Sequence, residues 1–124
     1  MKLSRIESGL RLALAFYEAF NEHDIEAMAA MISEDCLLET STPAPDGRII
    51  NGREAVTQYW QETLTGTADL HNDLEDIVGL GQRAIAAWRQ EWTDASGAAQ
   101  HTRGVDILRF QSNRITEIKS YTKG

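Results

Sequence analysis

The sequence predicts an α+β fold, in which helices pack on one face of an antiparallel sheet. Three observations predict it. The first half of the chain carries three segments whose apolar residues recur at helical spacing. The second half carries four consecutive segments of strand length. These segments are separated by the turn signals "GLGQ", "ASG" and "SN".

The three helices are expected in the first half of the chain. Apolar residues recur three and four positions apart from residue 6 to residue 20, until "NEHD" interrupts the pattern. Asp24 is expected to cap a second helix that carries Ile25, Met28, Met31 and Ile32. A strand over "CLLETST" and a loop over "PAPDG" follow. The third helix is expected from Arg53 to Leu64, with Gly66 as its stop.

The four strands are expected at residues 69–78, 83–94, 99–111 and 114–122. Alternate residues of a strand point to the same face of the sheet. One face of the second strand then holds Ala84, Ala86, Trp88, Gln90 and Trp92, and it is expected to look inward. In the third strand, Asp106 shares the inward face with Leu108 and Phe110. A carboxyl group therefore stands in an apolar stretch, "RGVDILRF".

The first of these strands has a less regular pattern. Leu70, Asn72, Leu74 and Val78 form its more apolar set and are expected to point inward, which leaves His71 in solvent. Asn72 and Asp76 are then candidate polar groups on the pocket face. Asp76 close to Asp106 would form a coupled pair of carboxyl groups.

The opposite face of the sheet is also partly apolar, with Ile85, Val105 and Ile107. A small chain with an apolar outer face needs a partner to cover it, so we expect a homodimer.

Composition excludes several classes of function. The net charge of −7 and the pI near 4.9 argue against binding to nucleic acids or anionic membranes. No apolar run reaches the roughly 20 residues of a membrane span. The three histidines lack metal-ligand spacing, and no phosphate-binding loop or other cofactor motif appears. The single cysteine favours a reducing cytoplasm, and the 124 residues suit one domain, 1–124.

Three stretches carry a resemblance to a known family: "AFYEAFNEHDIEAMAAMISEDCLLET", "NGREAVTQYW" and "GVDILRFQSNRITEIKSY". In this order they resemble the nuclear transport factor 2-like superfamily, in its SnoaL-like and ketosteroid isomerase-like branch. The resemblance implies a cone-shaped fold, with three N-terminal helices packed on a curved, mostly antiparallel sheet that encloses an apolar pocket. It leaves function open, because this fold hosts isomerases, cyclases, dehydratases, hydrolases and non-catalytic binders.

The resemblance assigns roles residue by residue. Asp106 stands where the ketosteroid isomerases keep a protonated aspartic acid that hydrogen-bonds a developing oxyanion. Phe16 replaces their tyrosine donor, Thr40 replaces their aspartate base, and Trp60 stands at a supporting tyrosine. Ser120 stands where limonene epoxide hydrolases have a catalytic aspartate. The resemblance therefore implies neither steroid isomerisation nor epoxide hydrolysis.

Two functions remain open at this stage. The first is a cofactor-independent enzyme, of isomerase, cyclase, dehydratase or hydrolase type, that uses Asp106 as an acid on an apolar, carbonyl-bearing small molecule. The expected ligand contacts are Phe16, Thr40, Tyr59, Trp60, Asn72, Asp76, Trp88, Gln90, Trp92, Leu108, Phe110 and Ser120. The second is a non-catalytic ligand-binding or protein-interaction module. In a purely structural role, Asp106 would pair with an arginine or cap a bulge.

Overall fold

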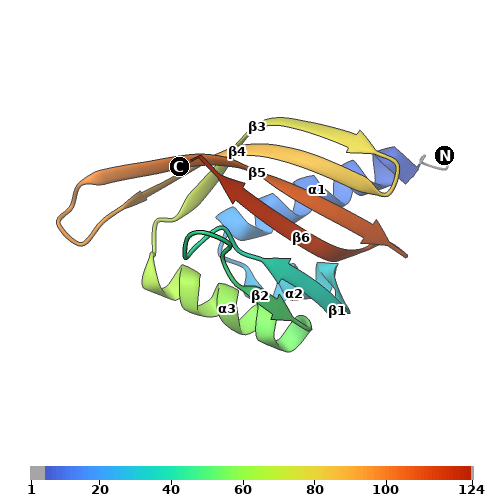
Figure 1. Ribbon diagram of the computed structural model, residues 1–124, viewed down its shortest axis with the longest axis horizontal. Coiled ribbons are helices and arrows are strands. Elements are labelled where there is room, and N and C mark those ends of the chain that lie inside the picture. Colours follow the sequence, from blue (N-terminus) through green and yellow to red (C-terminus); the bar gives the residue numbers. More distant parts are fainter. Residues whose placement is uncertain (1–4, 124) are drawn as a thin grey trace.

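The computed structural model describes residues 5–123 and confirms the α+β prediction (Figure 1). The helices are α1 (Arg5–Asn21), α2 (Ile25–Met31) and α3 (Arg53–Gly66). The strands are β1 (Ile32–Glu39), β2 (Ile49–Asn51), β3 (His71–Leu80), β4 (Arg83–Thr93), β5 (Ala99–Gln111) and β6 (Arg114–Thr122). They form a six-stranded sheet in the order β2-β1-β6-β5-β4-β3. The β1–β6 pair is parallel and the other pairs are antiparallel.

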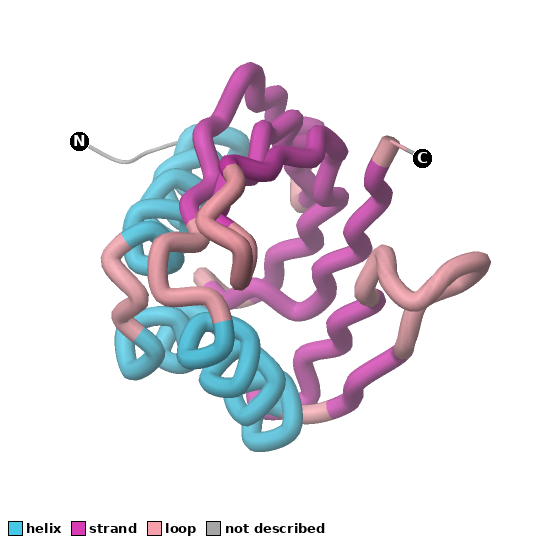
Figure 2. The backbone as a smooth tube through the Cα atoms, turned by 90° about the vertical axis from the view of Figure 1, so that its left-hand side faces the viewer, coloured by secondary structure: helices cyan, strands magenta, loops and turns pink. Residues whose placement is uncertain are grey.

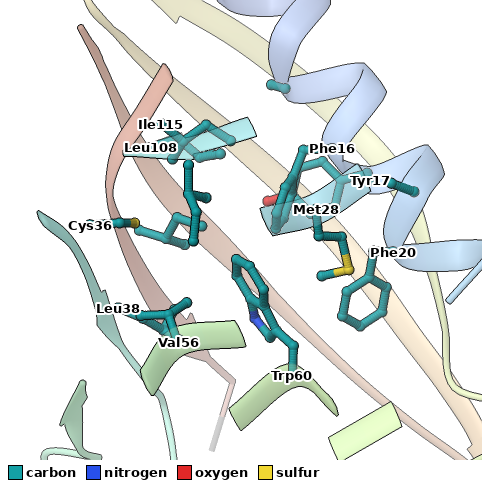
Figure 3. Close-up of a cluster of buried hydrophobic side chains, with 14 of the residues drawn as sticks. Phe16, Tyr17, Phe20, Met28, Cys36, Leu38, Val56, Trp60, Leu108 and Ile115 are labelled. Carbon is teal, nitrogen blue, oxygen red and sulfur yellow. The ribbon is translucent and has the colours of Figure 1, made fainter. Parts of the chain in front are cut away.

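The helices and the sheet wrap around a common interior. Figure 2 shows the helices on one side and the strands curving around the other. Helix α1 packs against β3 and β4, and α3 packs against β1 and β2. Figure 3 shows the buried cluster between these layers, in which Phe16 and Tyr17 from α1 and Trp60 from α3 lie close together. No helix within residues 5–123 is long and apolar enough to cross a membrane.

The start of β1 differs from the expectation. Asp24 caps α2 as predicted, because its Oδ1 accepts a hydrogen bond of 3.1 Å from the Ala27 amide. The helix ends at Met31, however, and Ile32 is already extended. Ile32 pairs with Ile115 of β6, and its carbonyl accepts hydrogen bonds from the Arg53 guanidinium. These two long-range partners place Ile32 in the strand and not in the helix.

The hairpins of the second half follow the predicted boundaries closely. The β5–β6 turn has positive φ angles at Ser112 (51°) and Asn113 (59°), as a two-residue turn between twisted antiparallel strands requires. Strand β3 begins at His71, two residues later than expected. The three-residue strand β2 was not predicted, and it pairs with β1 at the edge of the sheet.

A bulge in β3 reverses the predicted side-chain alternation. Leu74 lies opposite Trp88, but Asp76 lies opposite Ala87, so β3 carries one extra residue there. Beyond the bulge, the prediction that Asp76 and Val78 point inward is wrong. The side chain of Asp76 is exposed and accepts a hydrogen bond from the Ile77 amide, and Val78 is 45% exposed. A one-residue slip moves every following side chain to the other face.

Candidate functional site

A cavity of about 420 Å³ lies between α1, α3 and the inner face of the sheet. Most of the predicted contact residues line it. Its aromatic walls are Phe16, Tyr17, Phe20, Tyr59, Trp60, Trp88 and Trp92. Its predicted polar groups are Thr40, Asn72, Gln90, Asp106 and Ser120. An apolar cavity with a few convergent polar groups is the usual form of a small-molecule site.

Asp106 lies in the wall of this cavity, in the middle of β5, and is only 7% exposed. The Tyr17 hydroxyl of α1 donates to its Oδ2 at 2.5 Å. The Ser120 hydroxyl of β6, directly opposite Asp106 in the strand register, donates to its Oδ1 at 2.6 Å. The carboxyl group is therefore held by two neutral hydroxyl groups from two different elements.

The structural alternative for Asp106 was a salt bridge to an arginine. Arg103, three residues before Asp106 in β5, instead forms a two-pronged ion pair with Glu75 at 2.8 and 3.1 Å on exposed side chains. Among residues 5–123, no arginine or lysine forms a salt bridge with Asp106. The buried carboxyl group therefore has no positive charge to compensate its own.

Burial raises the pKa of Asp106, and the Ser120 and Tyr17 hydroxyls oppose that shift only in part. The pKa of Tyr17 is raised well above its ordinary value, first by burial and then by the charge of Asp106. Because both shifts favour the neutral forms, the pair can hold a proton on the Asp106 carboxyl group. A neutral carboxyl group can donate a hydrogen bond to a carbonyl or enolate oxygen.

Trp88 forms the neighbouring part of the cavity wall. Its indole lies across Gly104, where an added Cβ would come within 2.8 Å of the ring and 2.2 Å of the Tyr121 carbonyl oxygen. Glycine is therefore required at position 104 by packing. The Nε1 of Trp88 is buried and makes no hydrogen bond among the described residues.

Two further predicted contact residues lie outside the cavity, as Asp76 does. Leu108 is fully buried, and Figure 3 shows it beside Ile115 in the core. Phe110 lines a different, shallower depression of about 810 Å³, beside the beginning of α1. Its ring lies 3.1 Å from the position of a Cβ on Gly9. Both share the face of Asp106, but they lie further along β5, where the core and α1 cover the sheet.

Thr40 lines the cavity, but its hydroxyl group already has partners. It donates to the Thr42 carbonyl oxygen at 2.7 Å and accepts from the Arg48 amide at 2.9 Å. The side chain therefore holds the loop between β1 and β2 and is not free to orient a ligand by that group.

His71 is exposed, as expected, and its Nε2 lies within hydrogen-bond distance, 2.8 Å, of Asp73 Oδ1 at the surface. It does not belong to the lining of the cavity.

Tyr17 was not among the predicted site residues. The resemblance placed the isomerase tyrosine at Phe16 and implied that its hydroxyl group is absent. In the structure, a tyrosine hydroxyl does reach Asp106, from the next residue of α1. The Phe16 ring instead packs edge-on against Tyr17, at 5.5 Å, and against Trp60, at 5.2 Å. The signal available in the sequence was the place of Tyr17 on the apolar stripe of the first helix.

Comparison with known families agrees with this geometry. A model of the SnoaL-like domain matches residues 13–118, most of the chain. The chain belongs to the SnoaL-like domain family. A solved NTF2-like protein of unknown function from Mesorhizobium loti is 34% identical, and the match covers 100% of this chain and 98% of that one, with a TM-score of 0.83. No curated protein matches the chain.

Two more distant structures share the fold of this SnoaL-like protein. A putative polyketide cyclase from Xanthomonas campestris pv. campestris is 23% identical over 97% of this chain and 93% of that one, with a TM-score of 0.82. A Mycobacterium tuberculosis protein in complex with estradiol-17β-hemisuccinate is 21% identical over 92% of each chain, with a TM-score of 0.79. At these identities the likeness establishes the fold alone.

Proposed function

We propose that this SnoaL-like protein is an enzyme that uses general acid–base chemistry on an apolar small molecule bearing a carbonyl group. The observation that carries the proposal is the buried Asp106 carboxyl group in the cavity wall, held by the hydroxyls of Tyr17 and Ser120. The names of the distant structural relatives, a putative cyclase and a complex with an estradiol derivative, are consistent with it.

In this proposal Asp106 donates a hydrogen bond to the carbonyl oxygen of the ligand. The hydrogen bond strengthens as negative charge develops on that oxygen, when a proton leaves the neighbouring carbon. Tyr17 and Ser120 orient the carboxyl group and stabilise it whenever it ionises. The aromatic walls exclude water and hold the flat, apolar part of the ligand.

One observation favours the alternative of a non-catalytic binding module. Within the described lining of the cavity, Asp106 is the only carboxyl group, and no histidine, lysine or cysteine accompanies it. Because Asp106 is protonated and donates to the carbonyl oxygen in this step, a proton leaving the ligand would go to a water molecule. A module that only binds a ligand needs no such acceptor.

The two functions are separated by measuring proton exchange next to a carbonyl group. We would incubate the protein with 2-tetralone in D₂O and follow the loss of its α-protons by NMR. The enzyme should accelerate the exchange, and Asp106→Asn should abolish the acceleration, whereas the exposed control Asp73→Asn should retain it. Binding of 2-tetralone without faster exchange would support the binding module and contradict the enzyme.

Tyr17→Phe should slow this exchange roughly tenfold, because one hydrogen bond to the reacting carboxyl group is lost. The Tyr17 hydroxyl lowers the pKa of Asp106, so its removal should raise that pKa further. The pH–rate profile should therefore move toward higher pH. A variant with reduced stability but an unmoved profile would show that Tyr17 acts only as a packing residue.

We also propose that the protein is a homodimer joined through the outer face of the sheet. Ile85 lies opposite Ile107, and Val105 lies opposite Tyr121, which is 49% exposed. These four side chains form an apolar stripe across β4, β5 and β6. A standard interface buries about 800 Å² per partner, and such a stripe can form its centre.

Ile107→Glu should convert this dimer to a monomer, because it places a charge at the centre of the apolar stripe. Light scattering at micromolar concentration should show half the mass of the wild type. Thr93→Glu, at the exposed end of β4, is the matched control and should remain dimeric. A monomeric wild-type protein, or an unchanged mass for Ile107→Glu, would contradict this interface.

A reducing compartment such as the cytoplasm suits this chain. Cys36 is the only cysteine, and its thiol is buried in β1. Burial and the nearby Asp35 raise its pKa to about 12, so the reactive thiolate is disfavoured. Cys36 therefore acts as a small apolar core residue in this proposal.

A further inference from the structure

Two polar atoms of the residues lining the cavity have no hydrogen-bond partner among the described residues, Trp88 Nε1 and Asn72 Oδ1, and only Asn72 Oδ1 is an acceptor. The side chain of Asn72 is only 6% exposed and lines the cavity. Its Oδ1 is buried and accepts no hydrogen bond from any described residue. Buried polar atoms are almost always hydrogen-bonded, because an unpaired one loses its contact with water and gains nothing in return. An unpaired acceptor in the wall of a cavity therefore points to a donor on the ligand.

The backbone of Asn72 is fixed by a second asparagine. Asn21, at the end of α1, donates from Nδ2 to the Asn72 carbonyl oxygen and accepts at Oδ1 from the Asn72 amide, both at 2.8 Å. Leu70, two residues before Asn72, is also held, because its carbonyl oxygen lies 2.8 Å from His23 Nε2. These contacts tie the beginning of the edge strand β3 to α1. The Asn72 side chain thus projects from a rigid segment, which suits a specificity-determining group.

Asn72 and Asp106 both line the cavity, in two different rows of side chains on the inner face of the sheet. Asn72 pairs with Gln90, and Gln90 pairs with Thr102, so these three inward residues form one row across β3, β4 and β5. Thr102 lies four positions before Asp106 in β5, which is about 13 Å along the strand. The indole of Trp88 lies between these two rows, against Gly104. The cavity wall therefore offers two polar positions with an aromatic surface between them.

We propose that the Asn72 carboxamide accepts a hydrogen bond from a hydroxyl group at the far end of the ligand, and that it selects elongated, flat ketones that carry such a hydroxyl group. The inference rests on the proposed function, because it takes the carbonyl end of the ligand to lie at Asp106. Asn72 is neutral, and the described lining holds no lysine, arginine or histidine. A neutral hydroxyl group therefore matches this end better than a carboxylate or a phosphate.

Three related ketones test this inference. They are 2-acetylnaphthalene, its 6-hydroxy derivative and its 6-methoxy derivative, and their binding can be followed by their own fluorescence. The wild type should bind the 6-hydroxy compound about tenfold more tightly than the 6-methoxy compound, which cannot donate. In Asn72→Leu this preference should disappear, while the affinity for 2-acetylnaphthalene stays within threefold. Asp73→Asn, on the outer face of the same strand, should retain the preference.

The outcome separates this inference from the proposed function. A preference for the hydroxyl group that persists in Asn72→Leu overturns the role of Asn72, and so does equal binding of the hydroxy and methoxy compounds to the wild type. If the preference depends on Asn72 but all three ketones bind Asp106→Ala as tightly as the wild type, the role of Asn72 holds and the proposed role of Asp106 fails. Asn72→Ala provides the same comparison if Asn72→Leu does not fold, as judged by circular dichroism.

Discussion

Replacement of Trp88 by alanine should lower the free energy of unfolding by about 3–5 kcal/mol, as for other buried tryptophans. Only 5% of Trp88 is exposed to solvent. Its indole packs against Gly104, and a glycine has no side chain that could move into the space left behind. The truncation would also join that space to the existing cavity, so the neighbouring side chains would lose contacts that they cannot replace.

Urea unfolding followed by the remaining tryptophans provides the measurement. Arg89→Ala is the matched control, because Arg89 is the next residue of β4, points outward and forms only an exposed ion pair with Glu91. An exposed pair contributes at most about 1 kcal/mol, so the control should change stability little. A near-neutral effect of Trp88→Ala would show that the inward face of β4 is assigned to the wrong alternate residues.

Much of the fold could be predicted because it depends on local patterns. The helical stripes, the Asp24 cap and the turns after β3, β4 and β5 are each encoded within a few residues. The start of β1 could not be predicted in this way. Ile32 suits either a helix or a strand, and its pairing with Ile115 and its contact with Arg53 decide between them. Those contacts join residues far apart in the sequence.

The candidate site was predictable to a similar degree. Alternation along β4 and β5 placed Trp88, Gln90 and Asp106 correctly on the inner face, because neither strand is bulged in that region. The same rule failed in β3, where the bulge after Leu74 turned Asp76 outward, and a single extra residue leaves no periodic signal. Tyr17 was missed because the partner of a buried carboxyl group depends on how a helix rotates against the sheet.

Asp106→Asn should separate function from stability more sharply than any other change. Loss of a general acid typically costs roughly 10²–10⁴-fold in rate, and the exchange reaction at Asp106 should fall by that amount. Stability should instead be retained or increased near neutral pH. Asparagine has nearly the same shape and can still hydrogen-bond the hydroxyls of Tyr17 and Ser120, but it carries no charge into the interior.

The dependence on pH follows from the direction of the pKa shift of Asp106. Because burial raises this pKa in the folded protein, the folded state holds a proton that the unfolded state has released above about pH 3.9. The free energy of unfolding of the wild type should therefore decrease as the pH rises from that value through the folded-state pKa. Asp106→Asn lacks this loss, so its advantage in melting temperature should be largest near neutral pH and should shrink as the pH is lowered toward 4. Asp73→Asn, which removes an exposed carboxyl group, controls for the change in net charge. A clear drop in melting temperature for Asp106→Asn at neutral pH would mean that the ionised carboxyl group stabilises the fold through Tyr17 and Ser120, and its assignment as a desolvated acid would be wrong.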